Sequence, residues 1–209
     1  MRIAVLASGG GTNVQALLDA QAAGALAPAR IVVVGSNKPG ARALDRARAA
    51  GVPAVAIDHK AYATRENFEA AMLAALAPHA PDAIVLAGFM RVLTPRFLEA
   101  FPLRVINTHP ALLPAFPGAH AIEEALAAGV KITGATIHFV DAGVDQGPII
   151  AQRAVPIFAA DTADTVRARI QAEEHALLPA VVRALAQGRI SCEGRRVTIA
   201  PSTDADQLL

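Results

Sequence analysis

Short apolar segments alternate with segments of helical periodicity over the first 90 residues, and no other feature of the chain restricts its fold as strongly. We predict strands at residues 3–6, 31–34, 54–57 and 83–86, separated by helices at 13–23, at about 41–50 and at 64–76. Strands that are apolar throughout are typical of parallel sheets whose two faces are covered by crossover helices. The chain is therefore predicted to be an α/β protein with a mostly parallel, twisted sheet and helices on both faces.

The pattern becomes looser after residue 95. We predict a strand at 104–108, a proline-containing loop at 110–118, a short helix at 123–128, strands at 131–140 and 149–156, a long helix at 162–186 and a terminal hairpin at 190–199. The long helix is expected to be interrupted or kinked near Pro179, because proline removes a helical hydrogen bond. The second half is therefore predicted to add mixed strands to the sheet, and the polar tail at 201–209 to be frayed.

The length of 209 residues suits one domain, which we predict to span residues 1–209. The longest apolar run, residues 83–90, contains Gly88 and is far shorter than the roughly 18 residues of a membrane span. The apolar stretch at the N-terminus is too short for a signal peptide. We therefore expect a cytoplasmic protein with no membrane partner.

Charge and cysteine content exclude several classes of protein. Nineteen basic and eighteen acidic residues give a net charge of +1, without the basic footprint of a protein that binds nucleic acid. A single cysteine, Cys192, excludes an intramolecular disulfide and a zinc site built from cysteines. The six histidines show no H-x-x-x-H spacing, so we predict no metal. The composition favours an enzyme or a small-molecule binder.

A glycine-rich turn lies between the first strand and the first helix. Its residues are Gly9-Gly10-Gly11-Thr12-Asn13, and such a turn presents free backbone N–H groups and a helix N-terminus to an anion. The turn is not a dinucleotide fingerprint, because Val14 stands where that motif needs glycine, and it lacks the lysine of a Walker A loop. Lys38, after the second strand, would add positive charge nearby. A tight turn without a ligand is the alternative.

A second candidate pair lies at the end of the predicted strand near residue 105. Asn107 and His109 point to the same face if this segment is a strand, and Pro110 ends it. Ligands of open α/β sheets bind beyond the carboxyl ends of the strands. The pair therefore offers an amide donor and a titratable imidazole where a ligand is expected, although a strand-end histidine can also be purely structural.

The loop at 141–148 contains two aspartates in a glycine-containing turn. Asp141 fits the role of a turn former, whereas Asp145 lies next to Gly147 and an apolar strand, which favours an inward role. His120 and His138 either enter the same site or make ordinary polar contacts.

These motifs, in this order and spacing, resemble the phosphoribosylglycinamide formyltransferase family, whose members are folate-dependent enzymes of purine synthesis. The likeness covers almost the whole chain. It is carried by Ala7-Ser8-Gly9-Gly10-Gly11-Thr12-Asn13, Ser36-Asn37-Lys38, Leu86-Ala87-Gly88-Phe89-Met90-Arg91, Asn107-Thr108-His109-Pro110-Ala111-Leu112-Leu113-Pro114, Phe116-Pro117-Gly118, His138-Phe139-Val140, Asp145-Gln146-Gly147-Pro148-Ile149-Ile150 and Gln171-Ala172-Glu173-Glu174-His175.

The resemblance implies a Rossmann-like fold and transfer of a formyl group from 10-formyltetrahydrofolate to the amine of glycinamide ribonucleotide, without a metal. It implies that residues 1–100 form the half that binds the nucleotide phosphate, and that residues 101–200 form the catalytic and folate-binding half. By motif, the catalytic residues are Asn107, His109 and Asp145. The residues for glycinamide ribonucleotide are Gly11, Thr12, Asn13, Gln171 and Glu174, and those for formyl-folate are Arg65, Met90, Arg91, Val92, Leu93 and Asn107.

Other functions stay open at this point. Within the same superfamily, the chain could be another formyltransferase that uses 10-formyltetrahydrofolate, or a formyl-folate hydrolase. An enzyme that formylates tRNA would be expected to carry a further C-terminal domain and a basic surface, and a hydrolase usually carries a regulatory domain at its N-terminus. From a different class, the chain could be a nucleotide- or folate-binding module without catalysis. The partners are expected to be small molecules, and the oligomeric state a monomer or a homodimer.

Overall fold

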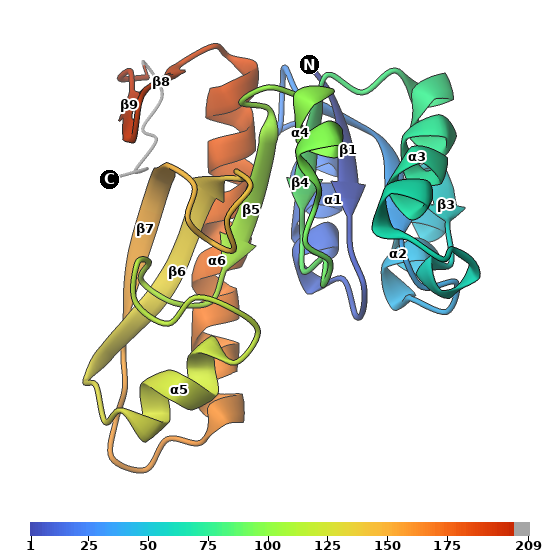
Figure 1. The fold of residues 1–209 in the computed structure, drawn as a ribbon. Helices are drawn as coiled ribbons and strands as arrows, with labels where there is room; N and C mark the ends of the chain where they lie inside the picture. The colour runs from blue at the N-terminus through green and yellow to red at the C-terminus, as the bar shows by residue number, and fades with distance from the viewer. Residues whose placement is uncertain (203–209) are drawn as a thin grey trace.

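A computed structural model describes residues 1–202 and contains a central sheet of seven strands in the order β3-β2-β1-β4-β5-β6-β7 (Figure 1). The strands are β1 (Arg2–Leu6), β2 (Arg30–Ser36), β3 (Ala54–Ala56), β4 (Ala83–Leu86), β5 (Val105–His109), β6 (Ile132–Phe139) and β7 (Ile149–Pro156). The five strands from β3 to β5 are parallel, and β6 and β7 continue the sheet antiparallel. The predicted parallel sheet with mixed strands in the second half is therefore confirmed.

Helices cover both faces of this sheet, as predicted. They are α1 (Thr12–Ala22), α2 (Arg42–Ala49), α3 (Arg65–Leu76), α4 (Pro95–Glu99), α5 (Ala121–Ala127) and α6 (Ala163–Ala186), with short 3₁₀ turns η1 (His59–Ala61) and η2 (Ala77–His79). A terminal hairpin of β8 (Ile190–Glu193) and β9 (Arg196–Ile199) follows and contacts β7. In Figure 1, α5 and α3 lie at opposite ends of the sheet. One sheet thus runs through both halves of the chain.

The alternation of side chains along β1 explains why both faces carry helices. Ile3 and Val5 belong to the apolar cluster with α1, α2 and α6, whereas Ala4 and Leu6 belong to the cluster with α3 and α4. All four side chains are fully buried, as expected for a central strand of a parallel sheet, whose successive residues point to opposite faces.

Two local features differ from the expectations, and part of a third lies outside the described residues. The predicted interruption near Pro179 is wrong, because α6 is assigned without a break from residue 163 to 186. Buried side chains on both sides of this proline, Leu177 and Leu178 before it and Val181 and Val182 after it, hold both segments against the sheet. This packing offsets the cost of a proline inside a helix, about 3 kcal/mol.

Helix α4 was not predicted, because a segment of five residues is too short to show a helical period. The tail expected to be frayed lies outside the described residues from residue 203 onward.

None of the helices within residues 1–202 combines the length and the apolarity that crossing a membrane requires.

The glycine-rich turn is held to a left-handed conformation where α1 meets α2. Gly11 is the N-cap of α1 and has a φ of 69°. A Cβ built on Gly11 would lie 2.7 Å from both the Cα and the Cβ of Ala43 in α2. Glycine is therefore required at this position by both the backbone and the packing.

Replacing Gly11 by alanine is expected to lower the free energy of unfolding by roughly 1–3 kcal/mol, because the variant adds left-handed strain and a clash. Gly10→Ala is the matched control, since a Cβ on Gly10 meets no atom within 4 Å. Thermal denaturation of both variants checks this: equal melting temperatures for the two would contradict the packing argument.

Candidate active site

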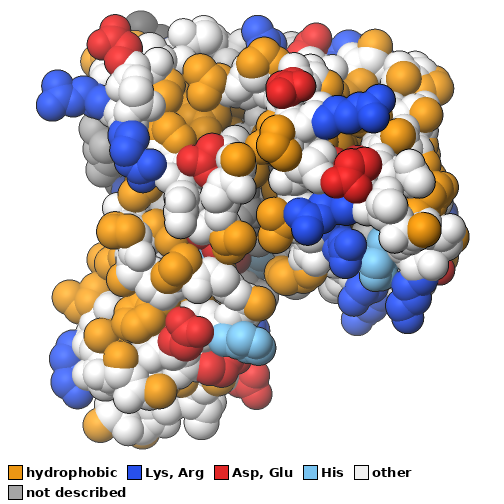
Figure 2. All heavy atoms as spheres, viewed as in Figure 1, with side chains coloured by type: hydrophobic (Ala, Val, Ile, Leu, Met, Phe, Trp, Pro, Cys, Tyr) orange, Lys and Arg blue, Asp and Glu red, His pale blue; other side chains and the backbone are white. Residues whose placement is uncertain are grey.

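A cavity of about 380 Å³ lies where the parallel strands end, and its lining contains the residues predicted to bind the nucleotide. Gly11, Thr12 and Asn13 line it from the start of α1, and Gln171 and Glu174 line it from α6. Other lining residues include Ser8, Lys38, Met90, Thr108, Pro110 and Arg167. Figure 2 shows the surface hollowed between the part that carries α5 and the part that carries α2 and α3, with basic side chains gathered on the latter.

Backbone donors at the start of α1 make this cavity suited to an anion. The first N–H groups of any helix lack intrahelical acceptors, and in α1 the N-cap Gly11 has no side chain to cap them, so they are left for a ligand. Arg46 of α2 donates from Nε to the Gly10 carbonyl at 2.8 Å and from Nη1 to the Gln15 side-chain oxygen at 3.0 Å, which places a cation beside the turn. The helix dipole adds to this positive potential.

Glu174 forms hydrogen bonds to two other elements that line the cavity. It is only 5% exposed, and its two carboxylate oxygens accept hydrogen bonds from Asn13 Nδ2 at 3.1 Å and from Thr108 Oγ1 at 2.7 Å. This carboxylate therefore joins α6 to the glycine-rich turn and to β5. Sequence reasoning missed Thr108, although a hydroxyl residue between Asn107 and His109 on a strand must face the opposite side of the sheet.

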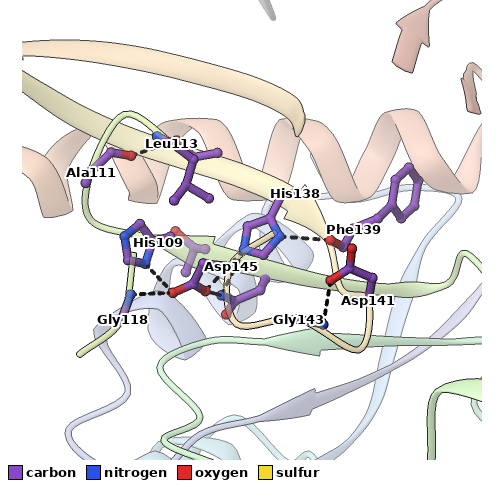
Figure 3. A network of polar contacts seen from close by, with 12 residues as sticks. His109, Ala111, Leu113, Gly118, His138, Phe139, Asp141, Gly143 and Asp145 are labelled. Atoms are coloured by element: carbon purple, nitrogen blue, oxygen red, sulfur yellow. Dashed lines mark hydrogen bonds and ion pairs between the residues drawn. The ribbon is translucent and has the colours of Figure 1, made fainter. Parts of the chain in front are cut away.

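The predicted catalytic residues form one network around Asp145 (Figure 3). Asp145 Oδ2 lies 3.3 Å from His109 Nδ1 and accepts the backbone N–H of Gly118 at 2.8 Å. Asp145 Oδ1 lies 3.4 Å from Asn107 Nδ2 and 3.6 Å from His138 Nε2. The structure thus brings together residues from β5, from β6 and from the loops at 110–120 and 141–147.

Both ring nitrogens of His109 face acceptors. Nε2 lies 2.8 Å from the carbonyl oxygen of Phe116, and Nδ1 faces Asp145. A carbonyl oxygen and an ionised carboxylate only accept hydrogen bonds. The protonated imidazole, which carries an N–H on each nitrogen, therefore satisfies both contacts at once.

His138 joins the network, whereas His120 does not. His138 is paired with Asn107 across β5 and β6 and is 1% exposed. Its Nδ1 donates to the Phe139 carbonyl at 2.8 Å, so Nε2 faces Asn107 Nδ2 at 3.1 Å and Asp145. Nε2 accepts from the amide when it is unprotonated and donates to the carboxylate when it is protonated. His120 is exposed at the N-terminus of α5.

The protonation of Asp145 is set by opposing effects. Burial raises the pKa of its carboxyl group, but the contact with His138, the Gly118 N–H and the charges of His109 and His138 outweigh burial and lower that pKa below its usual value. Asp145 also adopts a φ of 53°, which aspartate and asparagine tolerate better than most residues. Asp141 is confirmed as a turn former, because its Oδ1 accepts the Gly143 N–H at 3.0 Å.

The residues expected to bind formyl-folate are more dispersed. Met90 lines the cavity, Val92 is exposed, and Arg91 Nε is buried without a hydrogen-bond partner among the described residues. Leu93 is 4% exposed and belongs to the apolar core, so its side chain is not available to a ligand. Arg65 is exposed at the start of α3 and does not line the cavity.

Comparison with known proteins places this geometry in a family. Residues 1–182 match the family described as formyl transferase. The chain belongs to the formyl transferase family. It is 49% identical over 204 residues to phosphoribosylglycinamide formyltransferase of Mycobacterium tuberculosis (95% of this chain, 94% of the relative). It is 41% identical over 190 residues to the Escherichia coli protein of the same name (91% and 89%).

Solved structures of formyl transferase relatives share the whole fold. Glycinamide ribonucleotide transformylase 1 from Symbiobacterium toebii superposes with a TM-score of 0.94 at 50% identity, over 96% of this chain and 94% of that one.

Within residues 1–202, no cluster of three or more histidine, cysteine, aspartate or glutamate side chains could hold a metal ion.

The lowered pKa of Asp145 predicts how stability depends on pH. A carboxylate whose pKa is lower in the folded state stabilises the fold at pH values above its unfolded pKa, about 3.9, and this contribution is lost as the pH falls through the folded value. The melting temperature of the wild type should therefore exceed that of Asp145→Asn most clearly near neutral pH. The difference should shrink on acidification below about pH 4, where the protonated aspartic acid resembles the amide. A difference that is constant with pH would contradict this assignment.

Proposed function

We propose that the chain transfers the formyl group of 10-formyltetrahydrofolate to the amine of glycinamide ribonucleotide, a step of de novo purine biosynthesis, as a monomer or a homodimer. One observation carries the proposal: the His109–Asp145 ion pair lies at the end of β5, directly beside the cavity that the start of α1 lines. Thr108 and Pro110, the neighbours of His109 in sequence, both line that cavity. A reactive centre and an anion site therefore adjoin each other, as required for a substrate that carries an amine at one end and a phosphate at the other.

The cavity accounts for the nucleotide. The phosphate binds the backbone N–H groups of Gly11, Thr12 and Asn13, and Lys38 adds a positive charge. The oxygens of Glu174 accept from Asn13 and Thr108 and keep further lone pairs for ribose hydroxyls, beside Gln171. Binding energy from the phosphate then serves to position the distant amine.

The network around Asp145 accounts for the chemistry. A C–N bond forms between the substrate amine and the formyl carbon, which turns the formyl oxygen into an oxyanion and the amine into an ammonium. N–H groups of Asn107 and protonated His109 stabilise the oxyanion, and each such donor is worth about 2.7–4 kcal/mol. For this, Nε2 of His109 exchanges its contact with the Phe116 carbonyl for one with the formyl oxygen, while Nδ1 stays on Asp145. The bond from carbon to the folate nitrogen then breaks, and the proton lost by the amine passes to that nitrogen through His109 or a water molecule. Asp145 orients His109 through its contact with Nδ1.

Formyl-folate binds next to this centre. Met90, Arg91, Val92 and the backbone of Leu93 contact it, and Arg65 pairs with carboxylates of its glutamate tail. Arg65 and residues 90–93 precede residue 101, so the folate site draws on both halves of the chain. The division into halves is therefore proposed only in part. Residues 1–100 provide the phosphate site and residues 101–200 the catalytic groups, but the folate site does not belong to one half.

Mixing the purified protein with 10-formyltetrahydrofolate and glycinamide ribonucleotide tests the function directly, with deformylation of the folate followed by ultraviolet absorbance. Turnover that requires the nucleotide is the expected result. Turnover without any amine would indicate a formyl-folate hydrolase. Binding of both compounds without turnover would indicate a binding module.

Asp145→Asn is expected to lower kcat on the order of 10²-fold or more, the range for positioned acid–base groups, because it removes the charge beside His109. The KM for glycinamide ribonucleotide should stay within about threefold, since the nucleotide is held mainly at the phosphate. Asparagine keeps the size and tolerates the left-handed backbone. Asp141→Asn in the same loop is the control, and steady-state kinetics that give both variants the same kcat would remove Asp145 from the catalytic residues.

Gly10→Val is expected to raise the KM for glycinamide ribonucleotide at least about tenfold, because a side chain at the anion site obstructs the approach of the phosphate to the backbone. The KM for the folate should change little. Since a Cβ at this position meets no protein atom within 4 Å, the melting temperature should stay near that of the wild type. Isothermal titration with the nucleotide measures the effect directly, and unchanged affinity in this variant would place the phosphate elsewhere.

A further inference from the structure

Glu69 is a buried carboxylate that the proposed chemistry does not use. It lies on α3 and is 3% exposed, and Glu174 is the other buried glutamate among the described residues. Burying an ionised group is costly unless strong hydrogen bonds compensate it. Both carboxylate oxygens of Glu69 accept from a single residue, Thr94: Oε1 accepts the backbone N–H at 2.8 Å, and Oε2 accepts the side-chain hydroxyl.

Thr94 ends the irregular segment that connects β4 to α4, which we call the 87–94 loop. The other end of this loop is also anchored, because Ser8 Oγ accepts the N–H of Met90 at 2.8 Å and the N–H of Ser8 donates to the Gly88 carbonyl at 2.9 Å. Between these anchors, Phe89 and Leu93 are buried. The loop is thus pinned at both ends and leaves Met90 and Val92 exposed.

Glu69 also follows Arg65 by four residues on α3. Residues separated by four positions lie on the same face of a helix, one turn apart. A carboxylate that holds Thr94 therefore fixes the position of α3 relative to the 87–94 loop. Arg65 and residues 90–93 belong to these two elements, and they are the two separate parts of the proposed folate site.

We propose that Glu69 is a positioning residue for formyl-folate: its carboxylate clamps Thr94 so that Arg65 and the 87–94 loop form one preorganised site. The inference rests on the proposed function, because the roles of Arg65 and of residues 90–93 belong to it. Apolar packing of Phe68 and Met72 holds α3 on the sheet, but such packing does not direct individual backbone N–H groups. The two hydrogen bonds from Thr94 to Glu69 fix the orientation of the Thr94 backbone and hence of the loop.

Glu69→Gln tests the clamp. The amide keeps one acceptor oxygen for the Thr94 N–H, but its NH2 group cannot accept from the hydroxyl, so two charge-assisted bonds are replaced by neutral ones and the hydroxyl has to turn to accept. The KM and the Kd for 10-formyltetrahydrofolate should rise about tenfold, the effect of one hydrogen bond to a charged group. The KM for glycinamide ribonucleotide should stay within about twofold. Removing a negative charge near the site would by itself favour an anionic folate, so an increase cannot arise from charge.

Thr94→Val and Thr94→Ser provide a matched pair. Valine removes the hydroxyl but keeps the shape and the backbone N–H, and it should raise the KM for the folate in the same direction. Serine keeps both donors and should behave as the wild type. The combination of Glu69→Gln with Thr94→Val should be less damaging than the sum of the two, as expected for partners in one contact. Glu99→Gln, an exposed carboxylate at the end of α4, is the control for loss of charge.

The outcomes separate the clamp from the proposed function. If the wild type turns over and binds the folate by isothermal titration, but Glu69→Gln and Thr94→Val leave its KM and Kd unchanged, the clamp is overturned and the function stands. Equal losses in kcat and in both KM values, or a lower melting temperature alone, also overturn the clamp in favour of a purely structural role. A wild type that neither binds nor deformylates the folate overturns both. Should Glu69→Gln fail to fold, the valine and serine pair at residue 94 decides.

Discussion

The register between β5 and β6 is the constraint on which the candidate active site depends. β5 pairs parallel with β4 on one side and antiparallel with β6 on the other. The antiparallel register sets Asn107 opposite His138 and His109 opposite Thr136. A shift by one residue would turn Asn107 and His109 to the other face of the sheet and remove both from Asp145. The strand pairing therefore decides which side chains can contact Asp145 and donate hydrogen bonds to the same oxyanion.

Three partly or fully buried carboxylates connect the loops at the ends of the strands, and each is compensated in its own way. Glu174 receives two neutral donors from the glycine-rich turn and β5, Glu69 receives both donors from Thr94, and Asp145 combines one backbone N–H with two imidazoles. Of the three, Asp145 is the one whose partners include imidazoles, which become cationic when protonated, so its surroundings are the ones that can change charge. This difference separates a group suited to chemistry from two groups suited to holding segments in place.

Much of the fold and part of the site could be predicted from the sequence, because they depend on local periodicity. The assumption of a strand near residue 105, ended by Pro110, was sufficient to place Asn107 and His109 together on one face at a strand end. The contact with Asp145 could not be derived in this way, since it depends on how the loop at 141–147 returns to β5. Gly147 permits that return, because a Cβ there would lie 1.7 Å from the Phe139 carbonyl oxygen.

Glu69 shows a signal that sequence reasoning could have used. It shares a helical face with Met72 and Leu76, which are buried at positions three and seven residues further on, so a carboxylate stands on the apolar stripe of α3. Such a residue must find donors inside the protein, but periodicity does not say where, because Thr94 lies in an irregular segment with no period to extrapolate. The rule that buried charges need partners thus identifies the residue, whereas its partner follows only from the three-dimensional packing of α3 against the 87–94 loop.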